Sequence, residues 1–165
     1  MVEVINKNML SPTGFKFTIS RTPHLNFFIQ SVTLPGINFS ATEQPNPFRN
    51  IPIPSDKITF GDLDVTFKVD EDMKSYIEIF DWITGMGFPN DYNQYKSLHD
   101  SREGIYSDAN LMILSSAMNG NISIDIQDLF PVTLSSIELN TRDTSIEYIE
   151  ATASFRFLNY TFRKI

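Results

Sequence analysis

Hydrophobic and polar positions change their spacing within residues 60–83 of this chain. From Leu63 to Val69 apolar residues alternate with polar ones, which is the two-residue period of a half-buried β-strand. From Met73 onward the apolar residues recur every three or four positions, which is the period of an amphipathic α-helix. The pattern therefore predicts a strand that runs into a helix across a short acidic junction.

The acidic junction is the segment Asp70-Glu71-Asp72. We expect Asp70 or Asp72 to cap the helix, because a carboxylate accepts hydrogen bonds from the free N–H groups of a first turn. A metal site is the less favoured interpretation, since the segment lacks the alternating ligands and the glycine of a calcium loop. The helix should end near Gly85. The stripe that it should bury is Met73, Ile77, Phe80 and Ile83, flanked by Tyr76 and Trp82.

The rest of the pattern predicts a mainly β protein. Alternation in residues 14–20 and an apolar run in residues 26–34 predict two strands joined by a hairpin loop at residues 21–25. Further strands are expected at about residues 107–116, 121–127, 132–139 and 146–158, with a turn at residues 118–121. Together these elements predict one domain over residues 1–165, a β-sandwich or barrel with one flanking α-helix.

Two segments interrupt this pattern. Residues 37–56 contain four prolines, and proline lacks the N–H group that a central strand would donate. We interpret this segment as a stiff projecting loop with an edge strand near residues 48–53, because a long loop in a compact domain usually serves a contact. Residues 85–106 are polar and contain three tyrosines, which predicts an insertion loop.

The amino-acid composition supports a folded β protein and excludes chemistry that depends on cysteine. Of the 165 residues 41% are apolar, and the 14 phenylalanines favour pleated, half-buried surfaces. The absence of cysteine excludes disulfides and thiolate chemistry. No apolar run is long enough to cross a membrane as a helix, and the first residues lack a secretion-signal pattern, so we expect neither a membrane anchor nor secretion.

The net charge of the chain indicates which partners it can bind. The formal net charge is −7, and the acidic residues are spread over both halves of the chain. Nucleic-acid binders generally carry a basic patch that neutralises phosphates, and the sequence has none. An acidic surface repels DNA, so this protein can stand beside DNA but is not expected to grip it.

No catalytic pattern stands out in the sequence. His99 lies beside Asp100, which could make it a base, yet no nucleophile motif accompanies it. Asp62 and Asp64 resemble a pair of catalytic carboxylates, but alternate positions of one strand place them more simply on an exposed polar face. The glycine pair near residue 86 ends the expected helix, whereas a phosphate loop begins one. We therefore expect no enzyme activity, cofactor or metal.

Several stretches together resemble the tail tube protein family of contractile-tailed bacteriophages, including related proteins that initiate the tube at the baseplate. "GFKFTIS" (14–20) and "FFIQSVTLPGI" (27–37) resemble that family's first hairpin with its Leu-Pro-Gly turn. "IPIPSDKITFGDLDVTFKVDEDMKSYIEIFDWI" (51–83) resembles its turn, strand and Trp-ended helix, and "IEYIEATASFRF" (146–157) resembles its closing strand. Ser55 departs from the glycine that the family tends to carry before Asp56, and the insertion at 85–106 has no clear counterpart.

The resemblance implies a non-enzymatic structural protein of the virion. Its fold would be a β-sandwich or barrel-like tail tube fold whose copies join into a ring-shaped composite β-barrel. Six copies would form each ring, and stacked rings would form a hollow tube through which viral DNA passes without specific binding. The tail sheath, baseplate and tail terminator proteins would be its partners. The protein would lie in the phage tail, after assembly in the host cytoplasm.

Three groups of residues take roles from this resemblance. The loop that would reach a neighbouring ring or subunit includes Pro45, Pro47, Phe48, Arg49, Ile51 and Pro52. Candidate acids facing the lumen, where they would repel DNA phosphates, are Asp62, Asp64, Glu147 and Glu150. Candidate contacts to the sheath or to a neighbour are Tyr92, Tyr95 and Tyr106.

Two other functions stay open on the sequence. A ring that initiates the tube in the baseplate hub would have the same fold but would not polymerise. A monomeric β-sandwich that binds carbohydrate would use exposed aromatic side chains such as Tyr92 and Tyr95. The mass in solution would distinguish such a monomer from a ring.

Overall fold

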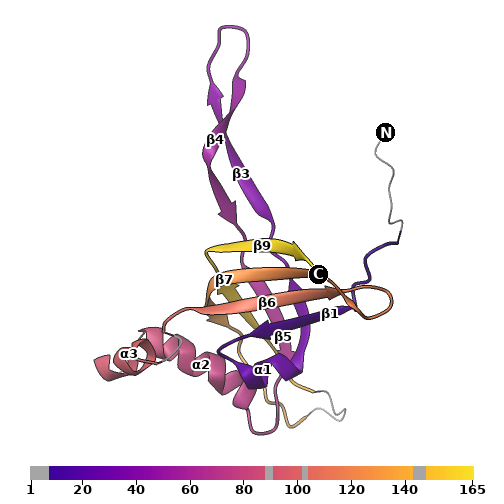
Figure 1. Cartoon of the computed structure of the whole chain (residues 1–165). Helices are drawn as coiled ribbons and strands as arrows, with labels where there is room; N and C mark the ends of the chain where they lie inside the picture. The colour runs from indigo at the N-terminus through magenta and orange to yellow at the C-terminus, as the bar shows by residue number, and fades with distance from the viewer. Residues whose placement is uncertain (1–7, 88–90, 102–103, 143–147) are drawn as a thin grey trace.

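The computed structural model describes residues 8–87, 91–101, 104–142 and 148–165, and it is mainly β (Figure 1). The elements in chain order are β1 (Phe15–Ile19), α1 (Pro23–Phe28), β2 (Ile29–Thr33), β3 (Ile37–Gln44), β4 (Ile51–Phe60), β5 (Leu63–Lys68), α2 (Lys74–Gly87), α3 (Tyr92–His99), β6 (Ser107–Leu114), β7 (Gly120–Leu134), β8 (Glu150–Arg156) and β9 (Asn159–Lys164). The mainly β fold expected from the sequence is confirmed.

Seven strands form one antiparallel sheet that bends into two layers. The strand order is β1-β6-β7-β8-β5-β2, and β9 also pairs with β7. The long strand β7 belongs to both layers, because its first part pairs with β6 and β9 whereas residues 130–134 pair with β8. Between these parts Asp128 has a φ of 53°, a local irregularity of the kind that bends a strand. The described residues form no closed barrel within one chain.

The two layers are called the β6 layer and the β5 layer. The β6 layer consists of β1, β6, β9 and the first part of β7, and the β5 layer consists of β2, β5, β8 and residues 130–134. Buried side chains from both layers form one core, which includes Phe17, Leu111, Ile124, Val65, Phe67 and Phe155. α1 and α2 complete this core with Leu25, Ile79 and Trp82.

The alternation predicted for residues 63–69 is confirmed by the pairing of β5 with β8. Val65 lies opposite Ala153 and both are buried, whereas their neighbours Thr66 and Thr152 point to the other, partly exposed face. β5 and β8 therefore each have a packed face and a polar face, as the two-residue period requires.

The first predicted hairpin is wrong. Residues 23–28 form helix α1, which begins with Pro23 in a position where proline's missing N–H costs nothing. β1 pairs with β6, and β2 pairs with β5, so the two strands are not partners. The Asn26 side chain accepts from the Ile19 N–H at 2.8 Å and donates to the Ile19 carbonyl at 2.9 Å, which ties the helix to the end of β1.

The strand boundaries near the C-terminus also differ from those predicted. The segment 121–127 lies within the single strand β7, which continues through its bend and ends at Leu134, so only the first residues of the segment predicted at 132–139 are strand. The strand predicted at 146–158 is β8, which ends at Arg156, and the following strand β9 was not predicted. The predicted turn at 118–121 overlaps the connection between β6 and β7, residues 115–119, where the Ser115 N–H donates to the Asn119 carbonyl at 2.7 Å.

The N-terminal cap of α2 is confirmed, and its carboxylate belongs to Asp70. The Asp70 carboxylate accepts from the Ser75 N–H at 3.0 Å, the Ser75 hydroxyl at 2.7 Å and the Lys74 N–H at 3.2 Å. Slight burial raises the pKa of Asp70, but these hydrogen bonds outweigh that effect and hold the pKa below its usual value. The acidic junction is therefore a helix cap.

The buried stripe predicted for α2 is wrong. The helix buries Ser75, Ile79, Trp82 and Gly85. Met73, Ile77 and Phe80 are instead 39%, 45% and 51% exposed. Helices α1 and α3 both pack on α2, and the Trp82 Nε1–H donates to the Ile105 carbonyl at 2.9 Å, which fixes the face that turns inward.

Candidate assembly interface

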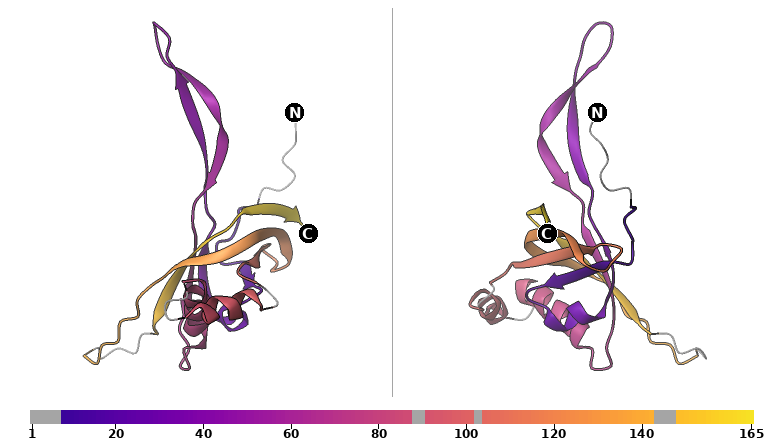
Figure 2. Two further views of the ribbon diagram at one scale, coloured as in Figure 1. Left: turned by 90° about the vertical axis from the view of Figure 1, so that its left-hand side faces the viewer. Right: turned by 45° about the vertical axis from the view of Figure 1, so that its right-hand side comes forward.

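Strands β3 and β4 form a separate two-stranded hairpin that projects from the domain (Figures 1 and 2). Its pairing runs from Ile37 opposite Phe60 to Gln44 opposite Ile51. Every β3 residue is exposed, and so is every β4 residue except Ser55 and Phe60. The projection predicted for residues 37–56 is confirmed, but the segment is a hairpin and not a loop. Since isolated two-stranded hairpins are marginally stable in water, this one calls for a partner surface.

The hairpin tip is held in shape by two local hydrogen bonds. The Asn50 side chain donates to the Glu43 carboxylate at 2.7 Å across the two strands. The Phe48 N–H donates to the Asn46 side-chain carbonyl at 3.4 Å, in a turn of the kind that asparagine favours. Phe48 is 95% exposed at this tip. The predicted contact residues Pro45, Pro47, Phe48, Arg49, Ile51 and Pro52 all lie at the tip or at the start of β4.

The base of the hairpin is fixed to the domain. The Gly61 N–H donates to the Gly36 carbonyl at 3.0 Å where the two strands leave the sheet. β2 and β5 continue below this point as paired strands of the β5 layer. The hairpin is therefore an extension of the β5 layer along its strand direction.

Three of the four predicted lumen acids lie on the polar face of the β5 layer. The Ser154 hydroxyl donates to the Asp64 carboxylate at 2.6 Å, and Glu150 lies opposite Lys68. Asp62 follows just before β5, and its carboxylate lies 3.0 Å from the Arg156 Nε. The fourth acid, Glu147, lies outside the described residues.

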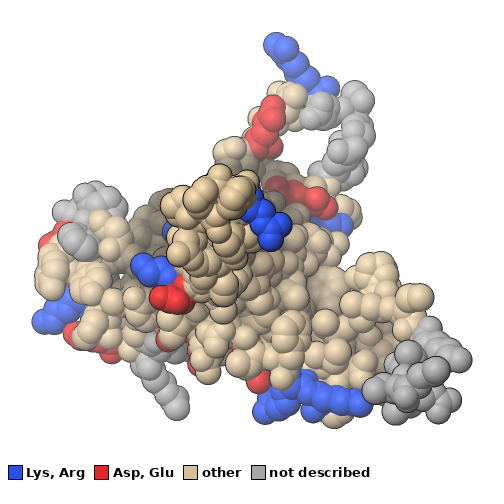
Figure 3. All heavy atoms as spheres, turned by 90° about the horizontal axis from the view of Figure 1, so that it is seen from above, with Lys and Arg blue, Asp and Glu red and all other residues tan. Residues whose placement is uncertain are grey.

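This polar face also carries basic side chains. Lys68 and Arg156 lie among the acids of β5 and β8. Viewed from the hairpin side, the molecule shows blue and red groups scattered over a mostly uncharged surface (Figure 3). The face seen there has no large patch of one sign, in keeping with the even spread of acids along the sequence.

The β5 layer has two edges that can accept a further strand. Among the described residues, β2 pairs only with β5, and residues 130–134 of β7 pair only with β8. Unpaired edge strands offer a row of N–H and C=O groups to another chain. One edge of a copy can thus pair with the opposite edge of a second copy.

The insertion at 85–106 is partly helical and forms an aromatic ledge on α3. The rings of Tyr92 and Tyr95 lie 5.8 Å apart, and Tyr95 stacks on His99 at 6.1 Å. Tyr106 belongs to a different group, since its ring packs edge-on against Phe130 of β7 at 5.8 Å. The structure therefore brings Tyr92 and Tyr95 together but leaves Tyr106 with the β-sheet.

The structure also shows how the side chains that could bind a metal or act in catalysis are arranged. In the described parts of the chain, no three His, Cys, Asp or Glu side chains gather closely enough to hold a metal ion. The His99 Nδ1 lies 3.4 Å from the Asp100 carboxylate, and both side chains are exposed at the end of α3. Among the described helices none is long and apolar enough to span a membrane.

Together these features define a β protein with open sheet edges, one polar sheet face and a projecting hairpin. The model of the phage tail tube protein family matches residues 2–163, and the chain belongs to this family. It is thus a structural component of a phage tail. A search of curated protein sequences gave no match.

Solved structures with a similar fold come from contractile assemblies. A chain of the extended PVC sheath–tube complex, an extracellular contractile injection system, aligns with TM-score 0.63 at 13% identity, covering 96% of this chain and 94% of that chain. A chain of the tube-terminating cap of the anti-feeding prophage aligns with TM-score 0.59 at 14% identity, covering 99% and 97%. A chain of that prophage's baseplate aligns with TM-score 0.57 at 11% identity, covering 90% of each. At these identities the similarity concerns the fold.

Proposed function

We propose that six copies of this chain join edge to edge into a closed ring. The observation that carries the proposal is the β5 layer, which has one packed face, one polar face and two open edges, β2 and residues 130–134. Open edges expose a monomer to uncontrolled pairing, and closure of a ring removes them. The β5 layers of the six copies would then form one continuous barrel.

The polar face of the β5 layer would line the lumen of that barrel. It carries Asp62, Asp64 and Glu150. Duplex DNA carries roughly one charge per 1.7 Å of its axis, and a basic wall would hold it by releasing counterions. Lys68 and Arg156 lie beside acids on this face, so the wall offers no continuous basic track. Viral DNA would therefore pass through the tube without being bound.

Stacked rings would form the tube, and the β3–β4 hairpin would make the contact between rings. Its separate pairing and its largely exposed side chains support this role. The Tyr92 and Tyr95 ledge on α3 would contact the sheath or a neighbouring subunit, as would Tyr106. The baseplate and the tail terminator would bound the tube at its ends. Membership in a family of structural proteins supports a role without catalysis.

The mass of the purified protein over a range of concentrations tests this proposal. Species of six chains and multiples of six support closed rings that stack. Species of six chains that never grow larger favour a single ring that initiates the tube in a baseplate. A monomer at every concentration contradicts the proposal and favours the carbohydrate-binding alternative, which glycan binding through Tyr92 and Tyr95 would then test.

A further inference from the structure

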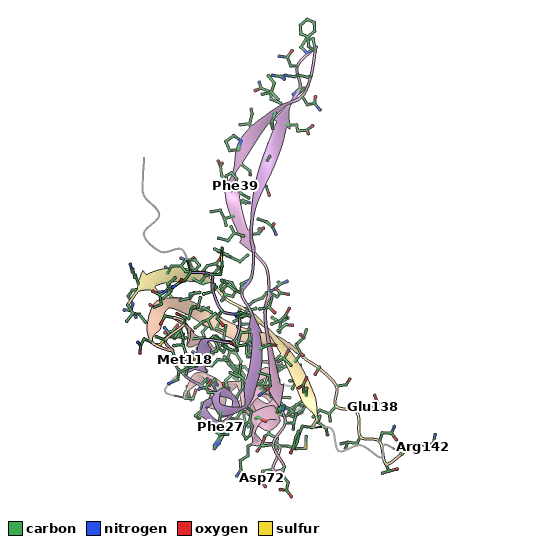
Figure 4. All side chains as sticks on the ribbon, turned by 90° about the vertical axis from the view of Figure 1, so that its right-hand side faces the viewer. Phe27, Phe39, Asp72, Met118, Glu138 and Arg142 are labelled. Carbon is green, nitrogen blue, oxygen red and sulfur yellow. The ribbon has the colours of Figure 1, made fainter. Side chains whose placement is uncertain are left out.

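An apolar depression opens at the end of the β5 layer that lies away from the hairpin. Its volume is about 710 Å³, and its apolar lining consists of Phe28, Val69, Met73, Ile137, Leu139, Tyr148 and Ile149. Asp70, Glu71 and Lys68 complete the lining. Figure 4 shows Asp72 and Glu138, which border these residues in sequence, at the opposite end of the molecule from Phe39 of the hairpin.

The exposure of apolar side chains in this depression is unusual for a protein that stays monomeric. Leu139 is 80% exposed and Tyr148 is 74% exposed, so large apolar side chains of the lining face solvent. The Lys68 ammonium lies 5.1 Å from the centre of the Tyr148 ring, but it covers only one side of one ring. Contiguous exposed apolar surface of this kind commonly marks an interaction site.

The hairpin tip has the complementary chemistry. Phe48 is an exposed aromatic side chain flanked by Pro47, and its turn is already held by the Asn46 and Asn50 hydrogen bonds. Arg49 is the single charged residue between Pro45 and Ile53. A tip with one ring and one guanidinium matches a depression lined by apolar side chains and two carboxylates, Asp70 and Glu71.

We propose that the depression receives the hairpin tip of a second copy of this chain, with Phe48 inserted among Val69, Met73 and Leu139 and with Arg49 beside Asp70 and Glu71. This inference rests on the proposed function, because it gives the stacking contact a named receptor. The preformed tip lowers the entropic cost of binding, since little remains to be ordered on contact.

The positions of tip and depression explain why such a contact repeats. The hairpin leaves the β5 layer near Leu63, and the depression lies where β5 ends at Lys68 and Val69. The two surfaces therefore lie at opposite ends of the same strands. A contact between two different surfaces at opposite ends is heterologous, and it extends without limit where its rotation does not close. The contact thus gives stacked rings a single direction.

A disulfide test is direct because the natural chain has no cysteine. The variant Phe48→Cys with Leu139→Cys should form crosslinks between subunits of assembled tubes, and denaturing gels should show a ladder of covalent multimers. Each single variant, and Phe48→Cys combined with Phe162→Cys on β9, should give no ladder. Tubes of the Phe48→Cys, Leu139→Cys variant without crosslinks under oxidising conditions would overturn the inference and leave the proposed function standing.

A second variant keeps the inference testable if the cysteine pair impairs assembly. Phe48→Ala should raise the concentration needed for stacking by roughly thirtyfold, as the loss of a central aromatic anchor typically does. Phe162→Ala removes another exposed phenylalanine away from both surfaces and should leave that concentration unchanged. Equal stacking by both variants would overturn the inference. Wild-type protein that never forms rings would contradict the proposed function, and the inference with it.

Discussion

Ser154 on β8 donates its hydroxyl hydrogen to the Asp64 carboxylate on β5 at 2.6 Å, across the polar face of the β5 layer. The bond holds an acid at a fixed position on an exposed sheet face, where a random surface aspartate would rotate freely. Asp62 lies two residues away and pairs with Arg156 at 3.0 Å. This order gives the proposed lumen wall a defined charge pattern that mutation can reverse.

Reversal of that pattern should slow the passage of DNA. In a phage that carries Asp64→Lys with Glu150→Lys, tails should assemble normally because neither side chain is in the core. A basic wall attracts phosphates, so DNA release should be slower, and the delay should shrink at high salt because salt screens the charges. The measurement is the rate of DNA release from purified particles after a trigger. Asp81→Lys, at an exposed position of α2, is the control for charge reversal away from this face, and an equal delay in that control would contradict the lumen assignment.

Closure of the ring should depend on both open edges of the β5 layer. Ser31→Pro on β2 and Thr133→Pro on the final part of β7 each remove one backbone N–H group from an edge strand of the β5 layer. Each variant should shift the population from rings to monomers, as measured by native mass. Far-ultraviolet circular dichroism and the unfolding temperature establish that each variant is folded. If either variant is folded and still forms as many rings as the wild type, the two edge strands do not pair between copies.

Trp82 should be a main determinant of domain stability. It is 1% exposed, and its Nε1–H donates to the Ile105 carbonyl at 2.9 Å, which joins α2 to the segment after α3. Trp82→Ala should lower the free energy of unfolding by about 3–5 kcal/mol through cavity formation. Trp82→Phe keeps much of the packing and should cost about 1–3 kcal/mol for the unsatisfied carbonyl. Urea titration measures both values, and an unchanged free energy of unfolding in Trp82→Phe would show that the hydrogen bond contributes nothing separate.

The Asp70 cap should make stability depend on acidic pH. Because the folded pKa of Asp70 is lowered, its contribution is present above the unfolded pKa and is lost as the pH falls through the folded pKa. Asp70→Ala should reduce the free energy of unfolding by about 1 kcal/mol at neutral pH and should weaken the fall in stability below about pH 4. Glu71→Ala is the control, since no described hydrogen bond of the cap involves it. Matching pH profiles for Asp70→Ala and wild type would refute this role.

Local patterns predicted the parts of the fold in which one interaction dominates. The strict alternation at Leu63, Val65 and Phe67 gave a correct strand, because each of these side chains is fully buried. The acidic junction gave a correct cap, because capping involves only neighbouring residues. The four prolines of residues 37–56 correctly indicated a segment outside the main sheet, although the pairing of β3 with β4 was not foreseen.

The sequence patterns gave wrong predictions where packing against another helix or strand determined the structure of a segment. α2 carries two apolar stripes at helical spacing, one with Ile77 and Phe80 and one with Ile79 and Trp82, and only packing against α1 and α3 selects between them. Residues 26–34 are a short apolar run, and such a run is compatible with either a helix or a strand. The apolar depression combines residues 28, 68–71, 73, 137, 139, 148 and 149, which come from separate parts of the chain, so no local pattern could have predicted it.

Negative-stain electron microscopy of the purified wild-type protein, over a range of concentrations, tests the central claim most directly. We expect rings with a central hole and, at higher concentration, hollow tubes built from stacked rings. Tubes whose end views show six subunits would support both the edge seam and the stacking contact. Particles of monomer size at every concentration, with neither rings nor tubes, would contradict the claim that these open edges close on copies of the same chain.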